Sequence, residues 1–281
     1  MIDSRIDVRP ISGNIGAEIH GVNIAANPSD EIIAQLRQAL VDHCVIFFRD
    51  QKLDMEQHIQ FTRRFGEMFI HPNHQTQHPG VLDNVREPGD ERIVGEDWHA
   101  DTTMMAEPPM GAILYASEVP TYSGDTCFAN QYLAYEALSE GLKRTLETLR
   151  AVHTDRMTAG PQAARNSKRA TKVREDAEWR PTVNTHPVVC THPESGRRYL
   201  FVNSAYSVGF EGWSEAESKP LLDYLLMHGH RPEFTCRFRW EKGSVAFWDN
   251  RSTKHIAIHD ARKFRRVMRR TQIAGTKPVL L

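Results

Sequence analysis

The chain has 281 residues, of which 40% are hydrophobic and 25% are charged, and its formal net charge is −1. A chain of this length can bury a substantial core, and its composition is that of a globular protein. The near-neutral charge excludes a general electrostatic attraction to nucleic acid or to an anionic membrane. No apolar run approaches the ~20 residues of a membrane helix. The first residues lack the profile of a signal peptide, so we expect a cytoplasmic protein that binds neither nucleic acid nor membrane.

Short strands and a few helices are predicted along the chain from the spacing of apolar residues. The predicted helices cover residues 30–43, 53–65, 131–150 and 214–228, and Ser214 with Glu217 forms a capping box at the last of them. The predicted strands lie within residues 6–24, 44–48, 97–103, 110–117, 125–129, 234–240, 244–250 and 264–275, with one more short strand among the loops of residues 70–96.

These elements do not alternate regularly between strand and helix, which argues against a doubly wound parallel sheet. Many short strands with few helices favour a mainly β protein, a β-sandwich or jelly roll with helices packed outside. Residues 155–183 are polar, basic and poor in apolar residues, so we predict a mobile loop or lid there. We expect residues 1–281 to form a single domain.

The 14 histidines prompt a search for metal-ligand spacings, whereas the four cysteines contain no CxxC pair and predict no zinc knuckle or disulfide framework. The sequence His99-Ala100-Asp101 is predicted as a strand, in which residues two apart point to one face. His255 follows a tryptophan-containing strand and is a natural third ligand. Two histidines and one carboxylate leave open positions on a metal, as in iron(II) oxygenases.

A His-x-Asp pair alone is weak evidence, because a surface histidine beside a solvated aspartate has the same sequence. Two further residues strengthen it. Thr126 lies 25 residues after Asp101, and Arg266 lies 11 residues after His255.

This pattern resembles that of the taurine/2,4-dichlorophenoxyacetate (TauD/TfdA) dioxygenases, in which a His-x-Asp pair is followed at these spacings by a threonine, a distal histidine and an arginine. The resemblance runs from about residue 10 to residue 275 and includes the segments FGEMFIHP, GEDWHADTT, EPPMGAILYASEVPTYSGDTCFAN, HPVVCTHPESGRRYLFVN and AFWDNRSTKH. It implies a double-stranded β-helix (jelly-roll) core, iron(II), O2, and 2-oxoglutarate as cosubstrate. It also implies that His99, Asp101 and His255 bind the metal.

The resemblance further implies that Arg266, helped by the Thr126 hydroxyl, holds the distal carboxylate of 2-oxoglutarate. A planar guanidinium suits such bidentate recognition. In a strand, Arg266, Met268 and Arg270 share one face, and an inward Arg270 needs an anionic partner. That partner is the substrate, the other end of the cosubstrate or a structural carboxylate, and the resemblance favours a substrate anion. A solvated edge strand is the alternative for this basic run.

Three more residues are assigned to the substrate site by the resemblance, namely His71, Thr102 and Tyr206. A loop histidine and a packing tyrosine are the alternatives for His71 and Tyr206. The loop around residues 71–97 departs from the taurine dioxygenase pattern. The sequence therefore predicts only a class of substrate: a sulfonate, a sulfate ester or an aryloxyalkanoate-like carboxylate. The enzyme is expected to hydroxylate this substrate. If the new hydroxyl lies beside a heteroatom, the C–X bond then breaks. The resemblance also implies a homodimer or homotetramer.

Two other classes of protein remain as alternatives. A zinc-dependent hydrolase can also use two histidines and an aspartate, with a water as fourth ligand. It gives no reason for Thr126 and Arg266 at their spacings. A non-catalytic jelly-roll binding protein leaves the inward arginines beside a complete triad unexplained.

Overall fold

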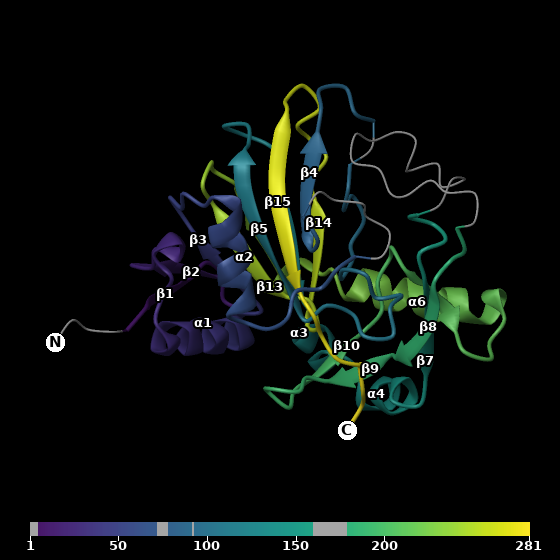
Figure 1. Cartoon of the computed structure of the whole chain (residues 1–281). Helices are drawn as coiled ribbons and strands as arrows, with labels where there is room; N and C mark the ends of the chain where they lie inside the picture. Colours follow the sequence, from purple (N-terminus) through teal and green to yellow (C-terminus); the bar gives the residue numbers. More distant parts are fainter. Residues whose placement is uncertain (1–4, 72–77, 92, 160–178) are drawn as a thin grey trace.

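A computed structural model describes residues 5–71, 78–91, 93–159 and 179–281 of the chain (Figure 1). Its helices are α1 (Asp30–His43), α2 (Met55–Arg63), α3 (Gln131–Glu136), α4 (Glu140–Leu146) and α6 (Glu215–His228), with 3-10 helices η1 (Ile24–Ala26) and η2 (Pro232–Phe234). Its strands are β1 (Asp7–Pro10), β2 (Ala17–His20), β3 (Val45–Phe48), β4 (Val81–Arg86), β5 (Gly111–Glu118), β6 (Thr126–Asn130), β7 (Arg150–Thr154), β8 (Val183–Pro187), β9 (Val189–Thr191), β10 (Arg198–Leu200), β11 (Ser207–Phe210), β12 (Thr235–Phe238), β13 (Val245–Asp249), β14 (Thr253–Ala257) and β15 (Arg266–Ile273).

Two sheets form the centre of the molecule. The larger has seven strands in the order β1-β2-β3-β13-β5-β15-β4, and the smaller has the order β12-β6-β14. Neighbouring strands are antiparallel except β2 and β3. Strands that are far apart in the sequence lie side by side, so residues separated by more than 100 positions meet between the sheets.

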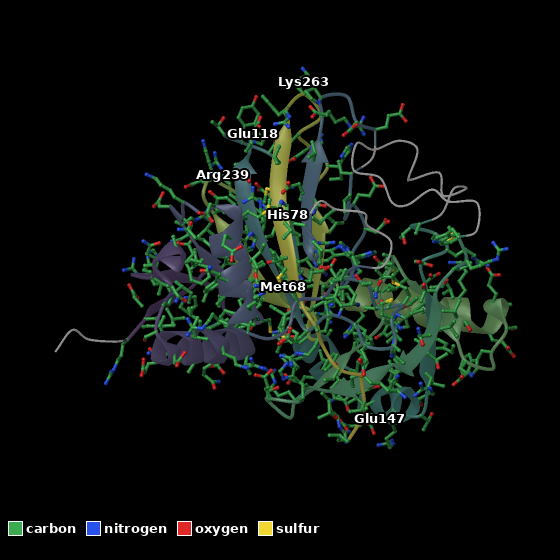
Figure 2. All side chains as sticks on the ribbon, in the orientation of Figure 1. Met68, His78, Glu118, Glu147, Arg239 and Lys263 are labelled. Carbon is green, nitrogen blue, oxygen red and sulfur yellow. The ribbon has the colours of Figure 1, made fainter. Side chains whose placement is uncertain are left out.

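Aromatic side chains hold the two sheets together. Phe47 of β3 stacks on Phe238 of β12 with ring centroids 4.0 Å apart, and Phe128 of β6 lies 5.9 Å from Trp248 of β13. All four are buried in one apolar cluster that spans both sheets. Because burial of one such side chain stabilises the fold by about 1.5–3 kcal/mol, this cluster fixes the spacing of the sheets. Figure 2 shows the side chains on this framework.

The outer face of the large sheet is covered by helices near the N-terminal end of the chain. Leu36 of α1, Phe61 of α2 and Phe247 of β13 belong to a second buried cluster. In Figure 1, α1 and α2 lie beside β3 and β2. The helix α2 begins at Asp54, whose carboxylate and Gln57 form a reciprocal capping box. The apolar faces of both helices are thereby used against the sheet, which leaves the inner face to build the site.

The predicted elements are confirmed in type for most of the chain. The helix predicted over 30–43 has those bounds, and Ser214 and Glu217 form the capping box predicted for α6. The helix predicted over 131–150 is instead two helices, because Ser139 caps a new one by accepting from Leu142 N. None of the described helices is both long and apolar enough to span a bilayer.

The strand predicted over 97–103 is wrong. Only an isolated bridge joins His99 to His255, and residues 101–104 form a turn in which Thr102 has a φ of 56°. Residues 160–178 of the predicted lid lie outside the described part of the chain. Of the remainder, residues 155–159 form a turn and Val183 begins β8.

Phe247→Ala should lower the free energy of unfolding by about 3–5 kcal/mol, since it removes a ring from the middle of the large sheet and leaves a cavity. Phe247 is fully buried, and its ring centroid lies 4.8 Å from that of Phe65. Urea unfolding followed by circular dichroism measures the change. Tyr224→Ala, at a half-exposed aromatic of α6, is the control and should cost less than about 1 kcal/mol. Equal losses would contradict this assignment of the core.

Candidate active site

His99 and His255 face each other across a short antiparallel bridge. His99 N donates to His255 O at 3.0 Å, and His255 N donates to His99 O at 2.7 Å. Residues paired in this way point their side chains to the same face, and the two imidazole centroids are 4.1 Å apart. His255 lies on β14, an edge strand of the smaller sheet. The bridge therefore attaches the segment that contains His99 to that sheet.

Asp101 reaches the two histidines through a turn, not through strand alternation. Asn250 holds the turn, because its Oδ1 accepts from Asp101 N at 2.6 Å and its Nδ2 donates to Asp101 O and Pro109 O at 3.0 Å. Thr102 is in the left-handed region, which is rare for a β-branched residue. His99 and Asp101 lie close together, as the sequence predicted. The cause is the turn that Asn250 holds and not a β-strand.

The three side chains form a compact, buried cluster of donor atoms. Asp101 Oδ1 is 3.6 Å from His99 Nε2 and 4.0 Å from His255 Nε2. One ligand atom from each of the three residues lies within 4.8 Å of the other two. Asp101 Oδ2 is buried with no hydrogen-bond partner among the described residues. A buried carboxylate oxygen without a partner, next to two imidazole nitrogens, fits a divalent first-row metal.

Hydrogen bonds and burial set the protonation of this cluster. His99 Nδ1 lies 2.7 Å from the carbonyl of Asp97. Since a carbonyl only accepts, Nδ1 donates, which leaves Nε2, 3.6 Å from Asp101 Oδ1, as the ring nitrogen placed for a metal. Burial and the nearby His99 hold the pKa of His255 well below its usual value. Burial alone would raise the pKa of Asp101, but Arg270 and His99 outweigh it and keep that pKa well below the usual range. Neutral imidazoles and an ionised carboxylate are the forms that bind metals.

Two cavities open on either side of the cluster. The first, here called the arginine cavity, is lined by side chains of both sheets, including His99, Thr126, His255 and Arg266. The second, the tyrosine cavity, is lined by Asp101 and by the predicted substrate residues His71, Thr102 and Tyr206. Arg270 lines both. Every site residue predicted from the sequence therefore borders one of two adjoining spaces.

The arginine cavity is built to receive an anion. Arg266 Nε and Nη2 are shielded from solvent and have no hydrogen-bond partner among the described residues. Burial, together with the nearby Arg86, lowers the pKa of Arg266 to about 10, so it is still charged at neutral pH. Trp240 Nε1 donates to Thr126 Oγ1 at 2.9 Å. An indole nitrogen only donates, which leaves the Thr126 hydroxyl proton available for an acceptor in the cavity.

Arg270 has a carboxylate partner within the protein. Its Nη1 donates to Asp101 Oδ1 at 2.9 Å, and both side chains are buried. The sequence left three partners open for Arg270: the substrate, the other end of the cosubstrate and a structural carboxylate. The contact with Asp101 is of the third kind. Arg270 Nε is also buried and has no partner in the described part of the chain, so part of the guanidinium still lacks an acceptor.

Tyr206 is a neutral hydrogen-bonding group of the tyrosine cavity. Burial, followed by the nearby Asp101, raises its pKa to about 12, so the phenol keeps its proton at neutral pH. His71 borders the same cavity and directly precedes residues 72–77, which lie outside the described residues.

Sequence reasoning missed two residues that position the site, Asn250 and Trp240. Asn250 carries a weak signal, since it is a polar residue directly after the apolar strand β13. Trp240 carries none, because its partner Thr126 is 114 residues away.

A mainly β fold that holds two histidines and an aspartate beside a cavity, into which an arginine brings buried donors with no partner among the described residues, defines a mononuclear metal oxygenase of the jelly-roll type. The model of the family described as "Taurine catabolism dioxygenase TauD, TfdA family" matches residues 7–272. The chain belongs to this TauD/TfdA family.

Two curated relatives are similar over almost the whole chain. The alpha-ketoglutarate-dependent sulfate ester dioxygenase of Pseudomonas putida is 36% identical over 98% of this chain and 91% of its own length. The (S)-phenoxypropionate/alpha-ketoglutarate-dioxygenase of Sphingobium herbicidovorans is 31% identical over 96% of this chain and 95% of its own. The crystal structure of a taurine dioxygenase from Burkholderia xenovorans superposes with a TM-score of 0.81 at 39% identity, and covers 98% of this chain and 92% of that one.

These findings confirm the predicted fold and enzyme class. The chain is an Fe(II)- and 2-oxoglutarate-dependent dioxygenase with a jelly-roll core. They favour this class over a zinc-dependent hydrolase and over a non-catalytic binding protein.

Asn250→Ala should weaken the binding of a divalent metal by about 10–100-fold, since loss of the groups that orient a metal ligand has effects of this size. The physical reason is release of the Asp101 turn, which Asn250 bonds at both N and O. Calorimetric titration with Mn(II) measures the affinity. Asn23→Ala, at the cap of η1, is the control and should leave it unchanged. Unaltered Mn(II) affinity in Asn250→Ala would contradict this positioning role.

Proposed function

We propose that His99, Asp101 and His255 hold the ferrous ion of this enzyme and that it hydroxylates a small anionic organic substrate. One observation carries the proposal. Three donor atoms converge within 4.8 Å, beside a cavity in which Arg266 Nε and Nη2 are buried without a hydrogen-bond partner among the described residues. A metal satisfies the first group and a cosubstrate carboxylate satisfies the second.

Arg266 and Thr126 bind the distal carboxylate of 2-oxoglutarate in the arginine cavity. Arg266 offers a planar pair of donors. Thr126 Oγ1 accepts a hydrogen bond from Trp240, so its own hydroxyl proton can be donated to the carboxylate. Charge-assisted hydrogen bonds of this kind are among the strongest in proteins. They place the keto acid end of the five-carbon cosubstrate toward His99 and His255, which border the same cavity.

When bound, the ferrous ion supplies the activation of O2 and the oxidation of substrate, coupled to conversion of 2-oxoglutarate to succinate and CO2. The protein's part is to bind, to orient and to exclude water. His71, Thr102 and Tyr206 line the tyrosine cavity, where the substrate lies against Asp101. Arg270 Nε, which has no partner among the described residues, takes the substrate anion. If the new hydroxyl lies beside a heteroatom, the hydroxylated product collapses and the C–X bond breaks.

The substrate class is a sulfate ester, sulfonate or aryloxyalkanoate-like carboxylate, with alkyl sulfate esters first to be tested. The names of the relatives reported above support an anionic substrate, since a sulfate ester, a phenoxypropionate and taurine each carry an acidic group. The same proposal includes one catalytic domain over residues 1–281, a cytoplasmic location, and a homodimer or homotetramer in solution.

The anaerobic protein with Fe(II) and 2-oxoglutarate should develop a visible metal-to-ligand charge-transfer band, and His255→Ala should lose it because one metal ligand is gone. Absorption spectroscopy under nitrogen measures the band. His20→Ala changes a half-buried histidine of β2 and should keep the band. Absence of the band from the unaltered protein, or its persistence in His255→Ala, would refute the metal assignment.

Succinate release should be fastest with one of the anionic substrates, because Arg270 Nε is a buried donor without an acceptor among the described residues. A coupled succinate assay across alkyl sulfates, sulfonates and aryloxyalkanoates tests this, with the corresponding neutral ethers and alcohols as controls of equal size. A neutral compound as the best substrate would defeat the assignment of Arg270.

A further inference from the structure

A second arginine faces Arg266 in the wall of the arginine cavity. Arg86 on β4 is the direct cross-strand partner of Arg266 on β15. Such partners have their Cβ atoms about 4.5–5.5 Å apart, and like charges placed opposite one another are destabilising. Arg86 is only 6% exposed and lines the same cavity as His99 and Thr126. The sequence analysis gave Arg86 no role.

The polar atoms of this pair are not satisfied by the protein. Arg86 Nε and Nη2 are buried and, like Arg266 Nε and Nη2, have no hydrogen-bond partner among the described residues. Burial lowers the pKa of Arg86, and Asp90 and Asp260 only partly oppose it. Asp90 already accepts from Glu87 N at 2.9 Å. Two buried guanidinium groups with open donors therefore require an anion between them.

We propose that Arg86 is a second guanidinium for the distal carboxylate of 2-oxoglutarate and that it makes the cosubstrate site selective for a dicarboxylic 2-oxo acid. This inference rests on the proposed function. A carboxylate offers about four acceptor positions on two oxygens. The Arg266 fork uses two and the Thr126 hydroxyl uses one, which leaves one for Arg86. The cross-strand register puts that donor on the same side of the sheet as Arg266.

The test compares two ligands that share the metal-chelating end and differ at the far end. The affinities of 2-oxoglutarate and of 2-oxopentanoate, which lacks the distal carboxylate, are measured by calorimetric titration of the Mn(II)-loaded protein. Mn(II) allows binding to be read without turnover. Arg86→Gln should raise the Kd of 2-oxoglutarate by about tenfold or more, as expected for loss of a hydrogen bond to a charged group, and change that of 2-oxopentanoate by less than about twofold.

Arg265→Gln is the matched control. Arg265 is an exposed arginine that pairs with Glu87 and Glu118 at the end of β15, where Figure 2 labels Glu118 and Lys263. It should leave both affinities unchanged. Arg86→Lys keeps the charge but concentrates its donors on a single nitrogen, so it should bind 2-oxoglutarate with an affinity between those of Arg86→Gln and the unaltered protein. Circular dichroism checks the fold of each variant, and Arg86→Lys carries the test if Arg86→Gln does not fold.

The outcomes separate this inference from the function on which it rests. If Arg86→Gln binds 2-oxoglutarate normally while Arg266→Gln does not, Arg86 has no part in cosubstrate binding and the proposed function stands. Equal weakening of both ligands in Arg86→Gln would make Arg86 a structural residue and overturn the inference. If Arg266→Gln also binds 2-oxoglutarate normally, the cosubstrate site itself is wrong.

Discussion

Charge buried without a full set of partners is the constraint on which this structure depends. Asp101 lies buried beside the imidazoles of His99 and His255, and among the described residues only its Oδ1 meets a cation, Arg270. On the other side of the imidazoles, Arg86 and Arg266 point buried donors at a cavity and at no acceptor of the described chain. A polar group buried without a partner costs free energy. In the proposed function, a metal ion at the carboxylate and a dicarboxylate at the arginines would remove both deficits together.

The apolar core keeps these groups in place. The rings of Phe47, Phe128, Phe238 and Trp248 lock the small sheet against the large one. The Thr126 and His255 strands on one sheet therefore hold a fixed relation to the Arg266 strand on the other. Hydrogen bonds outside the apolar core hold the end of β13. Buried Asp249 accepts from His192 at 3.0 Å and from Arg251. That network holds the backbone directly before Asn250, and Asn250 in turn holds Asp101.

Features that depend on neighbouring residues could be predicted from the sequence, and contacts between residues far apart in the chain could not. The capping box at Ser214 and the helix over 30–43 depend on neighbours within a few residues, so both were predicted. The convergence of His99 and Asp101 was predicted, but strand alternation was the wrong reason for it. The turn that brings Asp101 inward depends on Asn250, which is 149 residues away. Arg86 escaped notice because only the register of β4 against β15 makes it the partner of Arg266.

The most direct test of the account is to locate the metal. A crystal of the protein grown with Mn(II) and 2-oxoglutarate can be measured at the manganese absorption edge, where anomalous scattering identifies the ion. The account predicts one strong peak bonded to His99, Asp101 and His255, with the far carboxylate of the ligand against Arg266. A manganese peak at another group of residues, with these three side chains left unligated, would contradict it.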